Sequence, residues 1–368
     1  MSLFTPLDYQ MMSRAIELAK GGIYTTAPNP NVGCVITRNG EIVGEGFHYR
    51  AGEPHAEVHA MRIAGNKTVG ATAYVTLEPC SHYGRTPPCA EGLIKAKVAK
   101  VICAMVDPNP QVAGRGIKML RDAGIEVQIG LLEQDALALN PAFIKTMKTG
   151  MPFVQLKMAA SLDGQTALAN GESQWITSAC ARQDVQKYRA LSGAILSTSQ
   201  TVIEDNASLN VRWDDLPNSL QSHYPQSELR QPVRVILDRQ NRLTPELKLF
   251  ETDGERLLVS DGGDIEPQLN DGNQIDLEAT LKTLVQTHGV NHIWVEAGAT
   301  LASSLLKQGL VDELIVYLAP KIMGSDGRGL LGALGLESMT DATDLEFKDV
   351  RQVGKDIRIV ATLKNKEV

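Results

Sequence analysis

The sequence predicts an α/β protein built from two domains. Segments with the alternating pattern of strands are interleaved with segments whose apolar residues recur at helical spacing. The length of 368 residues suggests roughly two to three domains. A short break at residues 148–152 separates two such α/β series. We therefore place one domain at residues 1–149 and the second at residues 150–368.

The first half begins with a helix that Gly21 and Gly22 end. A stiff loop over residues 28–33 then enters a hairpin whose turn is Asn39-Gly40. Pro141 predicts a kink or break in the last helix of this half. Predicted strands cover residues 32–37, 41–48, 72–77, 98–105 and 125–129, and predicted helices cover residues 8–20, 55–64, 89–97, 116–123 and 133–147. This alternation predicts a three-layer domain.

The second half repeats the alternation. Predicted strands cover residues 153–158, 193–198, 233–237, 256–259, 292–296, 313–318 and 357–363, and predicted helices cover residues 182–191, 277–288 and 301–308. Residues 206–231 and the Gly-rich residues 323–336 are predicted to be irregular. A turn of small residues, 297–300, joins a strand to a helix, and backbone N–H groups at such a helix start favour phosphate. A Rossmann fold is disfavoured because G-x-G-x-x-G is missing.

The composition is that of an ordinary globular protein, with 43% hydrophobic and 21% charged residues. The net charge of -7 argues against a nucleic-acid partner. No apolar run approaches the ~20 residues of a membrane helix, so no membrane partner is expected. Five cysteines, an odd number, and a start without the features of a signal peptide predict a reducing cytoplasmic location, where cysteines more often bind metal than pair.

One histidine and two cysteines predict a zinc site. His55 opens a predicted helix, Cys80 follows a strand, and Cys89 begins another helix. Three protein ligands and an open fourth position are typical of catalytic zinc. Glu57 is placed to handle protons beside the metal-bound water. The pattern H-x-E followed by P-C is typical of zinc-dependent nucleobase and nucleotide deaminases, although eight residues separate Cys80 from Cys89 where C-x-x-C is usual.

Other interpretations of these residues stay open at this point. His59, one helical turn after His55, could close a structural site with two histidines and two cysteines. A nucleic-acid base deaminase with an accessory domain would share the zinc motif, and a non-enzymatic scaffold would need only a structural zinc. One half could also have lost its activity. Cys34 and Cys103 lie in apolar strands and are predicted to be core residues.

Motifs along the whole chain resemble the bifunctional deaminase–reductase family of riboflavin biosynthesis. The stretches that carry the resemblance are Asn29-Pro30-Asn31-Val32-Gly33-Cys34, His55-Ala56-Glu57-Val58-His59-Ala60, Thr76-Leu77-Glu78-Pro79-Cys80-Ser81-His82-Tyr83-Gly84-Arg85-Thr86-Pro87-Pro88-Cys89, Asp107-Pro108-Asn109-Pro110 and Ser161-Leu162-Asp163-Gly164. The long spacing between the two cysteines is this family's own version of the motif, so it supports the resemblance.

The resemblance implies a cytidine-deaminase-like N-terminal domain and a dihydrofolate-reductase-like C-terminal domain. The first would deaminate 2,5-diamino-6-ribosylamino-4(3H)-pyrimidinone 5′-phosphate with one zinc ion per chain. The second would reduce the ribosyl group with NADPH to give 5-amino-6-(5-phosphoribitylamino)uracil. The partners implied are this small-molecule substrate and other copies of the chain, as a homodimer or homotetramer.

The resemblance also implies site residues by position. In the deaminase domain, the substrate pocket would be lined by Asn29, His48, His82 and Arg85. In the reductase domain, the cofactor would contact Ala159, Trp175, Thr201, Asp205, Gly298, Ala299, Thr300, Leu301, Ala302, Ser303 and Ser304. The reductase substrate would contact Lys157, Ser173, Arg189, Leu209, Arg212 and Glu296. The two arginines in this set would grip the substrate phosphate, and the resemblance places Lys157, Asp205 and Glu296 near the reacting ribosyl carbon.

Overall fold

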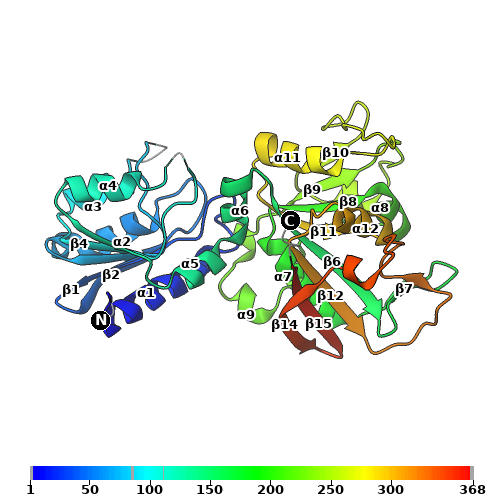
Figure 1. Cartoon of the computed structure of the whole chain (residues 1–368), viewed down its shortest axis with the longest axis horizontal. Helices are drawn as coiled ribbons and strands as arrows, with labels where there is room; N and C mark the ends of the chain where they lie inside the picture. Colours follow the sequence, from blue (N-terminus) through cyan, green and yellow to red (C-terminus); the bar gives the residue numbers. More distant parts are fainter. Residues whose placement is uncertain (1–2, 84–86, 111, 365–368) are drawn as a thin grey trace. The chain divides into compact units, whose positions relative to one another are not determined.

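The computed structural model describes residues 3–83, 87–110 and 112–364. The chain divides into two compact units, Met1–Gly150 and Met151–Val368 (Figure 1). The division falls one residue after the boundary expected from the sequence. Each unit contains its own sheet and its own hydrophobic clusters.

The first unit is a five-stranded sheet in the order β2-β1-β3-β4-β5. Its strands are β1 Gly33–Arg38, β2 Glu41–Phe47, β3 Thr72–Val75, β4 Lys100–Cys103 and β5 Glu126–Ile129. Its helices are α1 Pro6–Ala19, α2 Ala56–Ala64, α3 Cys89–Lys95, α4 Arg115–Asp122, α5 Glu133–Leu139 and α6 Pro141–Thr149. Strand β1 is antiparallel to β2 and β3, whereas β3, β4 and β5 are parallel.

Helices cover both faces of this sheet, as the predicted three-layer arrangement requires. Helices α1 and α5 pack on one face with Val35 of β1, and α2, α3 and α4 pack on the other with Cys34 and Ile36 (Figure 1). Cys34 and Cys103 are fully buried, which confirms their prediction as core residues. At Gly33 a Cβ would lie 1.9 Å from the carbonyl oxygen of Ala15, so only glycine lets α1 approach β1 this closely.

The second unit is an eight-stranded sheet in the order β10-β9-β8-β11-β6-β12-β15-β14, with a small sheet of β13 and β7 beside it. Its strands are β6 Phe153–Ser161, β7 Gln165–Ala167, β8 Ala194–Thr198, β9 Val233–Leu237, β10 Arg256–Val259, β11 His292–Glu296, β12 Glu313–Ala319, β13 Arg328–Gly329, β14 Leu345–Val353 and β15 Asp356–Leu363. Its helices are α7 Ala179–Leu191, α8 Ser199–Asp205, α9 Asn218–Gln221, α10 Lys248–Glu251, α11 Leu277–His288 and α12 Ala299–Lys307. Helices α11 and α12 pack on one face, and α7, α8 and α10 pack on the other.

Most predicted elements are confirmed, and the differences have local causes. The predicted break at Pro141 separates α5 from α6, where Asn140 exchanges hydrogen bonds with the backbone of Asn31 at 2.7 and 2.9 Å. Elements without a counterpart in the prediction are strands β7, β13 and β14 and helices α8, α9 and α10, of which β13 and α9 lie in segments predicted to be irregular. Strand β14 is exposed along most of its length, and an irregularity between Phe347 and Asp349 interrupts the alternation that would reveal a strand.

A membrane-spanning segment is not among the helices that the structure describes. None of them is both long enough and apolar enough to cross a bilayer.

Candidate functional site

The predicted zinc ligands converge in the first unit. Nδ1 of His55 lies 3.6 Å from Sγ of Cys80 and 3.3 Å from Sγ of Cys89. One ligand atom from each of the three residues lies within 4.8 Å of the other two. Such a cluster has the donor set and the compactness of a three-ligand zinc site.

Local structure explains the convergence. His55 is the N-cap residue of α2, and Cys89 is the first residue of α3. Cys80 follows β3, and its sulfur accepts a hydrogen bond from the backbone N–H of Cys89 at 3.3 Å. This hydrogen bond and the contact with His55 lie at two helix N-termini, where partial positive charge favours thiolates.

The protonation state of Cys80 suits a metal ligand. Its hydrogen bond with the Cys89 thiol, together with the His55 contact and against the effect of burial, lowers the pKa of Cys80. This shift favours the thiolate, which is the form that binds zinc.

Glu57 is buried beside the cluster, with 3% of its surface exposed. Burial raises the pKa of its carboxyl group, the neighbouring Cys80 raises it further, and His55 opposes this. Its Oε2 atom is buried without a hydrogen-bond partner among the residues described. A buried carboxylate oxygen without a partner, next to three metal-type ligands, fits a site that is completed by a metal ion and water.

His59 does not join the ligand cluster. Within the described ranges, the group that could hold a metal consists of His55, Cys80 and Cys89. His59 instead lies against Gly46 of β2, where an added Cβ would meet the Cβ of His59 at 2.5 Å. The structure therefore does not support a closed site with two histidines and two cysteines.

Two of the four predicted deaminase substrate residues lie together next to His55. The Nδ2 atom of Asn29 is 3.3 Å from Nε2 of His48, and the His48 and His55 rings are 5.2 Å apart. Burial lowers the pKa of His48, which leaves it neutral and able to hydrogen-bond a heterocycle. His82 is exposed in the ligand loop. Arg85 lies outside the described residues.

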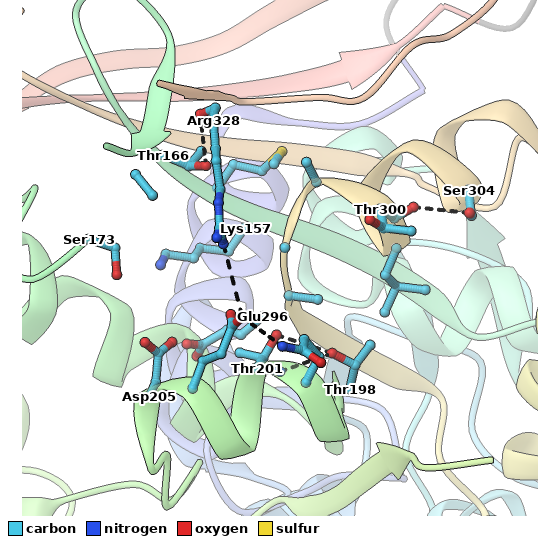
Figure 2. A pocket seen from close by; sticks show the side chains of 18 of the residues that line it. Lys157, Thr166, Ser173, Thr198, Thr201, Asp205, Glu296, Thr300, Ser304 and Arg328 are labelled. Atoms are coloured by element: carbon cyan, nitrogen blue, oxygen red, sulfur yellow. Dashed lines mark hydrogen bonds and ion pairs between the residues drawn. The ribbon is translucent and has the colours of Figure 1, made fainter. Parts of the chain in front are cut away.

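The second unit contains a large cavity of about 1320 Å³ at the carboxyl ends of its central strands. Figure 2 shows Lys157, Asp205 and Glu296 grouped in one part of it, with Thr300 and Ser304 of α12 apart from them. Gly298 is the N-cap of α12, makes no side-chain cap, and has open space around it. The first N–H groups of α12 have no intrahelical partners, which suits a phosphate of a dinucleotide.

The cavity is lined by many of the residues predicted for the reductase. Those that line it are Lys157, Ala159, Ser173, Thr201, Asp205, Glu296, Gly298, Ala299, Thr300, Leu301 and Ser304. Those that are not in its lining are Trp175, Arg189, Leu209, Arg212, Ala302 and Ser303. Ala302 and Ser303 are buried because successive residues of a helix face different directions. Trp175 lies between two lining residues, 62% exposed, with the Arg182 guanidinium 4.4 Å from its ring centroid.

Two of the charged residues that line the cavity, Lys157 and Glu296, lie on adjacent strands. Glu296 of β11 is the register partner of Lys157 of β6. Burial would raise the pKa of Glu296, but the ion pair with Arg189 outweighs it and holds the pKa at about 2. Burial lowers the pKa of Lys157, and the charge of Glu296 opposes this. Burial and Glu204 raise the pKa of Asp205.

The cavity lining also includes residues that the sequence analysis does not predict. Arg328 belongs to the segment predicted as a Gly-rich loop, and the Thr166 hydroxyl donates to its carbonyl oxygen at 3.1 Å (Figure 2). The guanidinium of Arg328 lies 4.0 Å from Glu204. Arg239 follows β9 and also lines the cavity. A cation after a predicted strand end was the available signal for Arg239, whereas Arg328 is brought in by the short β13–β7 pairing.

Two family models match this chain. The model described as the cytidine and deoxycytidylate deaminase zinc-binding region matches residues 6–105. The model described as the RibD C-terminal domain matches residues 152–359. The matched ranges contain the ligand cluster and the cavity, respectively.

Relatives match the chain over nearly its full length. The riboflavin biosynthesis protein RibD of Escherichia coli is 54% identical over 359 residues, which cover 95% of this chain and 98% of that protein. The RibD protein of Haemophilus influenzae is 55% identical over 98% of this chain and 99% of its own length.

Solved structures also match this chain over nearly its full length. Acinetobacter baumannii RibD superimposes with a TM-score of 0.91 at 48% identity and covers 98% of this chain and 99% of its own. A Thermotoga maritima protein, described as a diaminohydroxyphosphoribosylaminopyrimidine deaminase/5-amino-6-(5-phosphoribosylamino)uracil reductase, superimposes with a TM-score of 0.84 at 33% identity over 97% of this chain and 99% of its own.

Proposed function

This chain belongs to the RibD family of bifunctional deaminase–reductases in riboflavin biosynthesis, and from that premise we propose how its residues divide the two reactions. Residues 1–149 carry the deaminase and residues 150–368 carry the reductase. The observation that carries the proposal is the convergence of His55, Cys80 and Cys89 beside the buried carboxylate of Glu57.

The proposed deaminase substrate is 2,5-diamino-6-ribosylamino-4(3H)-pyrimidinone 5′-phosphate. The reaction adds water to the carbon that carries the 2-amino group and releases ammonia. His55, Cys80 and Cys89 would hold the zinc ion, which supplies a water of lowered pKa when bound. Glu57 would accept a proton from water at its free Oε2 atom and return protons to the ring nitrogen and the leaving amine.

Substrate recognition would use the polar residues around this centre. The Asn29 amide offers a donor and an acceptor to a pyrimidine edge, and its contact with His48 would fix its orientation. His82, exposed in the ligand loop, would contact the substrate from the solvent side. Arg85 stays proposed as a partner of the substrate phosphate, on the resemblance alone.

The reductase would convert the ribosyl group of the deaminated product to ribityl. Reductases of this family use NADPH, which supplies the hydride. The residues 298–304 at the start of α12 would hold cofactor phosphates, while Ala159, Trp175, Thr201 and Asp205 would contact the cofactor further along. Lys157, Asp205 and Glu296 would face the reacting carbon.

The remaining substrate contacts are proposed from the positions that these residues share with the family. Ser173, Leu209 and Arg212 would hold the substrate together with Arg189, which already uses Nε and Nη2 on Glu296. Arg212 is 47% exposed at its side chain and pairs with Asp215, three residues on. Because such a surface pair is weak, its guanidinium can be recruited by a phosphate.

We also propose that the enzyme works in the cytoplasm as a homodimer or homotetramer. Free thiols as ligands suit a reducing compartment. Strand β14 leaves Phe347 and Val350 exposed, by 65% and 56%, at the edge of the eight-stranded sheet. An exposed apolar edge strand favours pairing with another copy. Light scattering of the purified protein tests this, and a monomer mass would contradict it.

A coupled assay tests the two reactions. Purified protein with measured zinc content is given the diaminopyrimidinone phosphate, and ammonia and NADPH are followed separately. We expect about one zinc per chain, ammonia release without NADPH, and NADPH oxidation only after deamination. Removing zinc with a chelator should abolish ammonia release while the deaminated intermediate, supplied directly, is still reduced. Reduction before any ammonia release would contradict the proposed order.

A further inference from the structure

The carboxylate of Glu296 is held by three N–H donors. Nε of Arg189 donates to Oε1 at 2.6 Å, and Nη2 of Arg189 donates to Oε2 at 2.9 Å. The third donor is the indole Nε1 of Trp294, which donates to Oε1 at 2.8 Å. Trp294 lies two residues earlier on the same strand and does not line the cavity.

The indole of Trp294 is fixed by its surroundings. The residue is fully buried, and its ring stacks on that of Tyr188 of α7 with centroids 4.8 Å apart and planes 10° apart. The Arg358 guanidinium lies 5.6 Å from the centroid of the Tyr188 ring and forms an ion pair with Asp184 at 2.7 Å. Because aromatic stacking and this ion pair hold Tyr188 and Trp294 in place, the Nε1–H group has one direction in which to donate.

Arg189 is fixed as well. Its Nη1 donates to the carbonyl oxygen of Asn210 at 2.8 Å, and its side chain is 11% exposed. The carboxylate of Glu296, which lines the cavity, is therefore anchored by two residues that do not line it. Its charge faces the groups that share the cavity, which are Lys157 of β6 and Asp205 of α8.

We infer that Trp294 is a positioning residue of the reductase: its indole N–H holds the Glu296 carboxylate in a fixed orientation on the strand next to Lys157. This inference rests on the proposed role of Lys157 and Glu296 in the reductase. A carboxylate with three N–H donors stays an anion, so Glu296 serves as a fixed negative charge and does not deliver a proton. The neighbouring groups that can deliver one are Lys157 and Asp205.

The charges around Lys157 explain why the orientation of the Glu296 carboxylate matters. Burial lowers the pKa of Lys157, while the charges of Glu296 and Asp205 raise it and that of Arg189 lowers it. Glu296 is the register partner of Lys157, and among the neighbouring charges it does most to raise the pKa of Lys157 against the effect of burial. A Glu296 carboxylate free to turn away from Lys157 would leave the ammonium to deprotonate at lower pH.

The test is a double-mutant cycle on the full-length enzyme loaded with zinc. Trp294→Phe keeps the aromatic ring and removes the N–H donor. We expect the reductase kcat to fall about tenfold, as for the loss of one hydrogen bond to a charged group. We also expect the alkaline midpoint of the kcat–pH profile to move down, with ammonia release unchanged. In a Glu296→Gln background, Trp294→Phe should cause no further loss.

A matched control is Trp213→Phe. The Trp213 indole donates to the carbonyl oxygen of Tyr224 at 2.9 Å, in the same unit but outside the cavity lining. It should leave kcat and its pH profile as in the wild type. If Trp294→Phe does not fold, as shown by thermal unfolding, Tyr188→Leu removes the ring that orients the indole and should give a smaller loss that also vanishes in the Glu296→Gln background.

The outcomes are distinct. An unchanged pH profile in Trp294→Phe overturns the inference, and so does an equal loss of kcat in the Glu296→Gln background, because the residue would then act through packing alone. If Glu296→Gln itself reduces at the wild-type rate, the proposed role of Glu296 is wrong, and that result is visible without any Trp294 variant.

Discussion

The carboxylate of Glu78 accepts a hydrogen bond from the backbone N–H of Gly116 at 2.8 Å, which ties the segment after β3 to the first turn of α4. The same carboxylate accepts the N–H groups of Asp107, Gly114 and Ile117. A Cβ at position 116 would lie 2.0 Å from the carbonyl oxygen of Pro79, so glycine is required for this approach. Glu78 stands two residues before Cys80, and it therefore fixes the backbone from which a metal ligand projects.

Glu78→Gln should destabilise the first unit. The amide has the same shape, but its NH₂ group would face N–H donors and leave at least one of them unpaired. We expect a loss of about 2 kcal/mol in the free energy of unfolding and weaker retention of zinc. Urea unfolding and metal analysis measure both. Glu126→Gln, at an exposed glutamate of β5, is the control, and equal stability of the two variants would contradict the role of Glu78.

Glu57→Gln should abolish deamination while zinc stays bound. The amide cannot accept a proton, so ammonia release should fall by a factor of about 10² to 10⁴. Zinc content should not change, because the ligands are three other residues. Reduction of the deaminated intermediate by the same preparation is the internal control. Ammonia release at the wild-type rate would rule out Glu57 as the proton carrier.

Arg212→Ala should weaken substrate binding in the reductase. Losing a guanidinium–phosphate contact should raise KM for the deaminated substrate about tenfold. Zinc content and ammonia release should stay as in the wild type. Asp215→Asn is the matched control, since it breaks the same surface pair and keeps the guanidinium. A loss confined to deamination would show that Arg212 has been placed in the wrong half.

His292 should make stability depend on pH between about 4 and 6.5. Burial lowers the pKa of His292 to about 4, while its hydrogen bond to the Leu191 carbonyl opposes this. The unfolded chain therefore binds a proton that the folded chain does not, so stability falls as pH drops through this window. We expect about 1–2 kcal/mol less stability at pH 5 than at pH 7 from this residue. His292→Gln should remove that part of the pH dependence in urea titrations, and an identical pH dependence would contradict the assignment.

The zinc ligands can be predicted from the sequence because each one lies at the end of a helix or strand with a clear local pattern. His55 and Cys89 are fixed by helix starts, and Cys80 by a strand end, all of which have clear sequence patterns. The two sheets were predictable for the same reason, since their central strands are buried apolar runs. The break at Pro141 follows from the geometry of proline itself.

The features that the sequence does not predict depend on contacts between distant parts of the chain. The N–H donors around Glu78 come from residues 107–117, and backbone donors leave no mark in a sequence. No pattern in the sequence indicates that the Arg189 guanidinium donates to Glu296, 107 residues away in the chain. Strand β14 and helix α8 were missed because one is an exposed edge and the other is a short helix with no long apolar pattern.

The ligand cluster of His55, Cys80 and Cys89 is formed within the first unit, and the reductase cavity is formed within the second. A defect in one centre therefore leaves the other whole, and the genetics should show it. We expect complementation between two alleles, one encoding Glu57→Gln and the other Glu296→Gln, when both are expressed in a cell that must make its own riboflavin. The deaminated intermediate is made by the Glu296→Gln chain and can be reduced by the Glu57→Gln chain. A strain carrying either allele alone should require riboflavin in its medium.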